Sequence, residues 1–142
     1  MNESQALSSF AGLACGVLLI GFLVGVAILV AIILLLSSFL KRVPETHRKM
    51  QPGMVWLLVI PLFNIVWNFF VYRAISESYE SYFASQGRSE FGDCGKTIGL
   101  VYSICCCLCI IPFLNLLAGP AALILWIIYV IKLIGLKNQI PA

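Results

Sequence analysis

Long apolar runs separated by short polar segments dominate this chain and predict membrane-spanning helices. About 20 apolar residues in an α-helix cover the ~30 Å hydrocarbon core of a bilayer, and such a helix satisfies its own backbone hydrogen bonds in lipid. Four segments approach or exceed this length, at about residues 10–36, 54–75, 97–117 and 120–136. The pattern therefore predicts an all-α fold, namely a polytopic membrane protein formed by a four-transmembrane-helix bundle in one domain.

The connections between these segments also carry signals. Gly119 and Pro120 predict a tight turn between the last two segments, because proline suits the first position of a helix. After the second segment, apolar side chains recur at helical spacing, which predicts an amphipathic helix at the membrane interface over about residues 75–87, with Gly87 as its stop. The residues on that apolar face are Ile75, Tyr79, Tyr82 and Phe83.

Composition supports the membrane class and excludes others. Hydrophobic residues make up 61% of the chain and charged residues 11%, against about 25% charged in soluble domains. We therefore expect a membrane location, either a plasma membrane or a bacterial inner membrane, with the lipid bilayer as a partner. The net charge is only +3 and no basic face with interleaved aromatic residues is present, so nucleic acid is not an expected partner.

A cluster of basic residues lies between the first two apolar segments and consists of Lys41, Arg42, Arg48 and Lys49. These side chains are expected either to contact anionic lipid headgroups or to act only as a topology signal. In both cases the positive-inside rule places this loop in the cytoplasm and the N-terminus outside. In a four-span arrangement, however, the other five basic residues fall on the opposite side, so the overall bias disappears.

Two copies of an isoleucine-proline-x-x-asparagine sequence interrupt the apolar segments, with their polar positions at Pro61, Asn64, Pro112 and Asn115. Each proline removes an N–H group and is expected to free the carbonyl four residues earlier. The motifs predict helix kinks whose asparagines form hydrogen bonds between helices. Alternatively, they form a polar intramembrane binding site, as broken helices do in transporters.

Groups that carry catalysis or bind metals are scarce. No Asp, Glu, Lys or Arg lies near the middle of an apolar segment, and His47 is the only histidine, so we expect no enzyme activity and no cofactor. Cys105, Cys106, Cys107 and Cys109 share one predicted helix, and four thiols on one helix do not converge on a metal ion within one protomer. Packing is their expected role, with palmitoylation or redox chemistry as minor alternatives.

Small residues on the first apolar segment indicate helix contacts. Gly12 and Gly16 form one pair with spacing four, and Gly21 and Gly25 form another on a different face. Such pairs let helix backbones approach closely. They favour a homo-oligomer or contacts with other membrane subunits.

The sequence around the first proline motif carries a resemblance. Trp56 is followed by Ile60, Pro61 and Asn64, and an aromatic-rich amphipathic stretch comes next. This arrangement resembles small bacterial multi-span integral membrane proteins of unknown function. The resemblance implies a membrane protein and transfers no activity and no site.

Together these features predict a non-enzymatic membrane protein that acts by helix packing, as a scaffold or accessory subunit. The alternative is a small oligomeric transporter or channel subunit that uses the two proline-asparagine motifs. A membrane redox or metal-binding protein is the remote third hypothesis.

Overall fold

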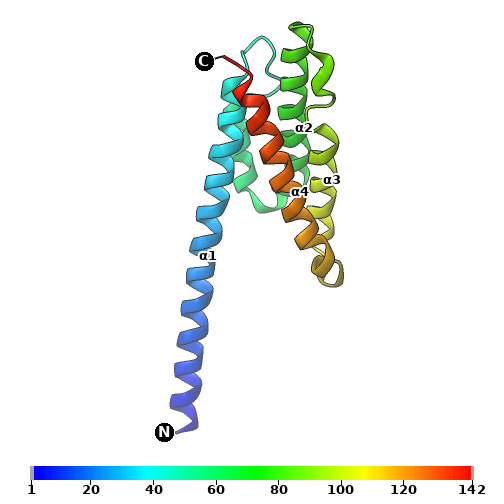
Figure 1. The fold of residues 1–142 in the computed structure, drawn as a ribbon. Helices are drawn as coiled ribbons and strands as arrows, with labels where there is room; N and C mark the ends of the chain where they lie inside the picture. The colour runs from blue at the N-terminus through cyan, green and yellow to red at the C-terminus, as the bar shows by residue number, and fades with distance from the viewer. Residues whose placement is uncertain (1, 142) are drawn as a thin grey trace. The chain divides into compact units, whose positions relative to one another are not determined.

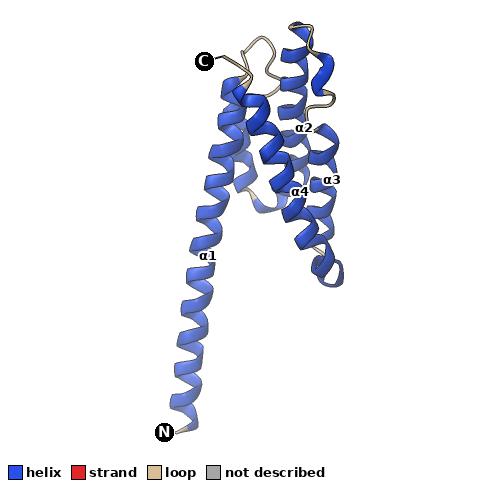
Figure 2. Ribbon diagram, viewed as in Figure 1, coloured by secondary structure: helices blue, strands red, loops and turns tan. Residues whose placement is uncertain are grey.

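The computed structural model describes residues 2–141, and the regular elements among them are all helical (Figure 2). The all-α class predicted from the sequence is thereby confirmed. The α-helices are α1 (Glu3–Arg42), α2 (Pro61–Ser85), α3 (Lys96–Leu108) and α4 (Pro112–Asn138), and the two 3-10 helices are η1 (Pro52–Val59) and η2 (Ser89–Phe91).

The chain divides into two units. Unit 1 consists of the residues up to Leu34 and is the N-terminal part of α1, whose apolar side chains are largely exposed. Unit 2 begins at Leu35 and contains the last turns of α1 and all later elements. A helix that is apolar on every side is typical of a membrane span, because nothing on its surface favours water.

Three parts of the described chain are long and apolar enough to cross a membrane, judged by length and composition. They are Glu3–Arg42, Ser89–Leu108 and Pro112–Asn138. These candidate spans suggest a membrane location. The predicted second span, residues 54–75, is not among them.

Unit 2 is built from two helical hairpins (Figure 1). In the first, η1 runs to a turn at Ile60 and α2 returns; in the second, α3 runs to a turn after Leu108 and α4 returns. Trp67 Nε1 donates a hydrogen bond of 2.8 Å to the Met54 carbonyl and thereby joins the two arms of the first hairpin. Helix α3 packs against both α2 and α4.

The hairpin turns do not lie where the sequence pattern predicts them. Residues 54–75 were expected to form one span, but Ile60 is extended at φ −79°, ψ 111°, and it separates η1 from α2. The turn expected at Gly119–Pro120 was also wrong, because Pro120 lies inside α4 and the break falls just before Pro112. A proline disfavours helical backbone at the residue before it. The chain takes this break at Ile60 and Ile111, whereas Pro120 remains inside α4.

The apolar face predicted over residues 75–87 is real, but its environment differs from the prediction. The segment continues α2 as expected, yet its face is buried in the protein rather than at a membrane interface. The Tyr79 hydroxyl donates a hydrogen bond of 3.1 Å to the Phe39 carbonyl. Every residue of the face is buried, namely Ile75, Tyr79, Tyr82 and Phe83.

The stop predicted at Gly87 is confirmed. Gly87 adopts φ 71°, its N–H group bonds the Ala84 carbonyl at 3.1 Å, and the Arg88 N–H group bonds the Phe83 carbonyl at 2.9 Å. These are the two hydrogen bonds of a Schellman motif, which ends a helix at a residue with left-handed backbone. Glycine adopts that backbone without steric cost.

The closest packing in unit 2 surrounds Tyr129 of α4, which is fully buried. Its hydroxyl donates a hydrogen bond of 3.0 Å to the Tyr72 carbonyl, and its ring lies 4.9 Å from the Tyr72 ring, centre to centre. A Cβ atom added at Gly99 of α3 would lie 3.0 Å from Tyr72 Cβ and 3.2 Å from Tyr129 Cε2. The missing side chain at Gly99 therefore lets the three helices meet around one aromatic ring.

We predict that Gly99→Ala destabilises unit 2 by about 1–3 kcal/mol, because overpacking a filled core forces its neighbours to shift. Gly135→Ala is the matched control, since a Cβ atom at Gly135 meets nothing within 4 Å. The control should leave the melting temperature unchanged or raise it, because alanine favours helix over glycine. Thermal unfolding of both variants in detergent measures the difference; equal melting temperatures would contradict the packing argument.

Candidate functional site

All nine lysine and arginine residues belong to unit 2, and most of them lie in the segments at one end of it. At this end lie the end of α1, the following loop, the connection from α2 to α3, and the C-terminus (Figure 1). Hydrogen bonds from Arg42 to the Ile140 carbonyl and from Lys137 to Ser38 tie these segments together. We call this region the charged end. It is the main polar surface of unit 2 and therefore its candidate functional site.

Two of the four residues predicted to contact headgroups, Arg42 and Arg48, bind backbone carbonyls of the fold. Arg48 Nε donates to the Leu40 carbonyl at 2.9 Å, and its Nη2 donates to the Val43 carbonyl at 2.9 Å, so Arg48 caps the C-terminus of α1. Arg42 donates two hydrogen bonds to the Ile140 carbonyl, at 3.1 and 2.9 Å. Lys41 and Lys49 are exposed. Among residues 2–141, these two are the members of the four whose side-chain nitrogens donate no hydrogen bond.

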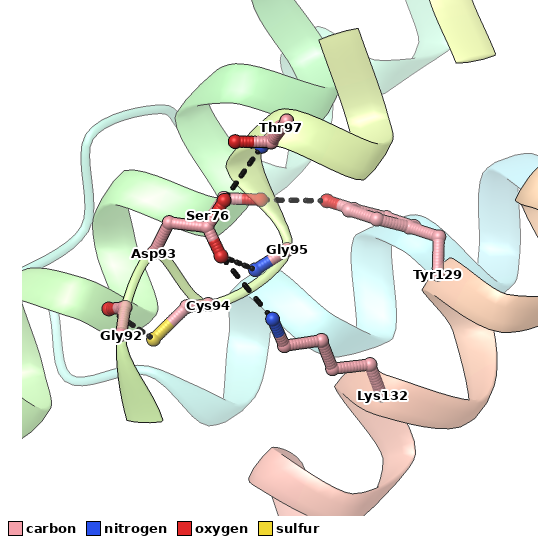
Figure 3. A network of polar contacts seen from close by, with 8 residues as sticks. All are labelled: Ser76, Gly92, Asp93, Cys94, Gly95, Thr97, Tyr129 and Lys132. Atoms are coloured by element: carbon pink, nitrogen blue, oxygen red, sulfur yellow. Dashed lines mark hydrogen bonds and ion pairs between the residues drawn. The ribbon is translucent and has the colours of Figure 1, made fainter. Parts of the chain in front are cut away.

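The carboxylate of Asp93, in the loop before α3, joins several polar contacts at the charged end (Figure 3). Asp93 accepts hydrogen bonds from the N–H groups of Gly95 at 3.1 Å and Thr97 at 2.9 Å. It also pairs with Lys132 Nζ of α4 at 3.2 Å. The same carboxylate thus caps the N-terminus of α3, where the helix dipole favours a negative charge, and ties it to α4.

A second polar contact lies near Asp93 and joins α2 to α4. The Ser76 hydroxyl lies 3.2 Å from the Tyr129 hydroxyl, which itself donates to the Tyr72 carbonyl (Figure 3). Ser76 and Tyr129 are both fully buried. A buried hydroxyl without a partner costs free energy, so this pair specifies the register between the two helices.

Glu77 links α2 to α3 at the edge of the charged end. Its Oε1 lies 2.8 Å from Arg73 Nε and 2.9 Å from Lys96 Nζ. The hydrogen bond from Arg73, then that from Lys96, holds the pKa of the Glu77 carboxyl below its ordinary value of 4.5. A neighbouring hollow is lined by Lys49, Glu77, Glu80 and Lys96, among others. Two cations and two carboxylates balance there, so the hollow does not select ions of one sign.

The structure starts a helix at each predicted proline-asparagine motif rather than kinking one. Pro61 and Pro112 are the first residues of α2 and α4. The carbonyls expected to be freed are those of Leu57 and Leu108. They accept hydrogen bonds from the N–H groups of Ile60 and Ile111, at 3.2 and 3.1 Å. The prolines therefore do not leave these carbonyls without a partner.

The two asparagines are not brought into a common polar site. Asn64 is half-buried and Asn115 is exposed, each in the first turn of its own helix. Asn115 Oδ1 lies 3.3 Å from where a Cβ atom of Gly119 would be, so the amide folds back along α4. Each asparagine N–H group closes the first turn onto Ile60 or Ile111, at 2.7 and 2.9 Å.

The cysteines of α3 and its end are free and half-buried, and Cys94 is free and buried. Within residues 2–141, no group of three or more His, Cys, Asp or Glu side chains is placed to hold a metal ion. In comparisons with known proteins, no family model, no curated protein and no solved structure matched this chain.

Sequence reasoning missed Asp93 and its partner Lys132. An acidic residue just before an apolar helix is a capping signal, so the position of Asp93 before Lys96 could have identified it. No such signal marks Lys132, because its role depends on how α4 packs beside the start of α3. The same is true of Ser76 and Tyr129.

We predict that Asp93→Ala lowers the free energy of unfolding by about 0.5–2 kcal/mol, the usual cost of losing a helix cap. Asp93→Asn should cost less, because an amide oxygen still caps α3 while the ion pair with Lys132 is lost. Thermal unfolding of both variants in detergent tests the order. An asparagine variant as unstable as the alanine variant would show that charge, not capping, is the main contribution.

We also predict a pH dependence from Glu77. Because its pKa is lower in the folded than in the unfolded chain, its ion pairs stabilise the fold above the unfolded pKa, and this contribution is lost as pH falls through the folded pKa. The melting temperature should therefore decrease on acidification below about pH 4.5. In Glu77→Gln this decrease should be smaller than in the parent protein. Identical pH profiles would contradict the assignment.

Proposed function

We propose that the protein is a non-enzymatic integral membrane protein, of a plasma membrane or bacterial inner membrane, that acts as a packing or accessory subunit. The observation that supports this most is the opposite character of its two units. Unit 1 presents an apolar helix with exposed side chains. Unit 2 uses several of its polar groups within its own fold, since Arg42, Arg48 and Asp93 bind helix ends or neighbouring segments.

Unit 1 offers two surfaces for another helix in the bilayer. A Cβ atom added at Gly12, Gly16, Gly21 or Gly25 meets nothing within 4 Å, so each small-residue pair is open to a neighbour. In lipid there is no hydrophobic driving force between helices. They associate through van der Waals packing, which improves when small residues let the backbones approach closely. We therefore propose that α1 spans the bilayer and that Gly21 and Gly25 contact a second copy or another subunit.

The four-span bundle is not part of this proposal. It required residues 54–75 to cross the membrane as one helix, whereas the break at Ile60 divides that segment. The transporter alternative required carbonyls freed by the prolines, and those of Leu57 and Leu108 have partners. The packing function therefore has more support than the transport function.

Photo-crosslinking in native membranes tests the packing function. A photoreactive residue at Val24, which is exposed and lies between Gly21 and Gly25 in sequence, should give a discrete protein adduct. Gly21→Ile should reduce the yield of that adduct about tenfold, because the added side chain prevents close backbone approach. A tenfold change corresponds to about 1.4 kcal/mol in the free energy of helix association. Leu18→Ile is the matched control, since it changes an exposed apolar residue without adding bulk. Adducts with lipid alone would contradict the proposal.

A further inference from the structure

After α1 the chain leaves the charged end twice, and it returns to that end each time. The backbone N–H group of Lys49 bonds Ser78 Oγ at 2.8 Å, so the segment between them, which contains the turn at Ile60, starts and ends at one place. In the same way, Lys132 Nζ lies 3.2 Å from Asp93 Oδ1, and these two residues stand at the two ends of the second hairpin. The return helices α2 and α4 therefore run in the same direction, toward the charged end (Figure 1).

Further contacts bring the C-terminal residues to the same end. Arg42, the last residue of α1, donates two hydrogen bonds to the Ile140 carbonyl, at 3.1 and 2.9 Å. Arg88, between α2 and α3, donates a hydrogen bond of 3.3 Å to Gln139 Oε1. The end of α1, the connection from α2 to α3 and the C-terminal residues are thus joined by direct contacts.

These contacts determine which segments share a face of a bilayer. Hydrogen-bonded atoms lie about 3 Å apart, whereas the hydrocarbon core is about 30 Å thick, so residues joined in this way belong to one face. The result is the same whether a hairpin turns inside the hydrocarbon or reaches the far side, because both of its ends lie on the face from which it started. After α1, the chain therefore makes no net crossing.

The charges of the two units indicate which face this is. Unit 2 holds all nine basic residues and five of the six acidic ones, which gives it a net charge of +4, whereas unit 1 holds Glu3 and no lysine or arginine. Lysine and arginine near membrane spans are retained on the cytoplasmic side. The four-span arrangement had no such bias, because it divided the basic residues between the two faces. The contacts at the charged end restore the bias.

We propose that α1 makes the only net crossing of the membrane, with the N-terminus outside and the charged end, including the C-terminus, in the cytoplasm. The two ends of the chain then lie on opposite faces, whereas four spans would place them on the same face. The charged end is therefore the surface that the protein presents to the cytoplasm. This inference rests on the proposed insertion of α1 but not on the packing function.

Cysteine labelling from each face of the membrane tests this topology. In a chain whose six native cysteines are replaced by serine, single cysteines are introduced at four exposed positions, namely Ser4, Lys41, Ser89 and Asn138. A membrane-impermeant maleimide should label Ser4→Cys in intact cells. It should label the other three variants only in inside-out vesicles, because their positions belong to the charged end.

Labelling of Ser89→Cys or Asn138→Cys in intact cells would overturn the inference, because four spans would place both positions outside. Labelling of Lys41→Cys in intact cells would overturn the assignment of the charged end to the cytoplasm. Release of the protein by alkaline carbonate would reject membrane insertion, and with it both the inference and the proposed function. Loss of the α1 adduct alone would reject the packing function and leave the topology unaffected.

A second measurement keeps the native cysteines. The full chain is expressed in bacterial cells with one of two reporters at its C-terminus. Green fluorescent protein becomes fluorescent when it stays in the cytoplasm, and alkaline phosphatase becomes active only outside it. We expect fluorescence from the first fusion and no phosphatase activity from the second. Active phosphatase without fluorescence would overturn the inference.

Discussion

The arrangement of unit 2 depends on the contacts of the buried Tyr129 side chain. Its ring occupies the place where α2, α3 and α4 meet, and Gly99 leaves room for it. Its hydroxyl bonds the Tyr72 carbonyl and lies beside Ser76, so the side chain fixes both the distance and the register between α2 and α4. The contact lies near the middle of both helices and therefore helps to hold the two hairpins parallel.

Because the hairpins are parallel, the charged loops lie at one end of unit 2. The hairpins bring the loop after α1, the connection before α3 and the C-terminus to this end, where Arg48 caps α1 and Asp93 caps α3. Several polar groups of this end therefore stabilise helix termini or form ion pairs. The opposite end carries mostly apolar side chains, with Asn64 and Asn115 among them. This separation of charge from apolar surface agrees with the membrane location that the three candidate spans suggest.

The proline-asparagine motifs show how far sequence reasoning could go. Their recurrence was visible in the sequence, but it did not show that each proline would start a helix rather than kink one. A proline at the start of a helix and a proline within one look alike in sequence, and Pro120 lies inside α4 while Pro112 starts it. The spacing of apolar residues identified the face over residues 75–87, but it did not identify what covers that face. Helical spacing identifies a buried face, yet lipid and protein core are both apolar.

What the sequence by itself determined is the helical class, the apolar character that suggests a membrane, the stop at Gly87 and the low number of catalytic groups. Each of these follows from local composition or backbone preference, which acts within a few residues. Only the tertiary structure decided that two hairpins share one direction, that Arg42 and Arg48 bind carbonyls, and that Asp93 meets Lys132. These contacts join residues far apart in the chain, and their geometry exists only once the helices have packed.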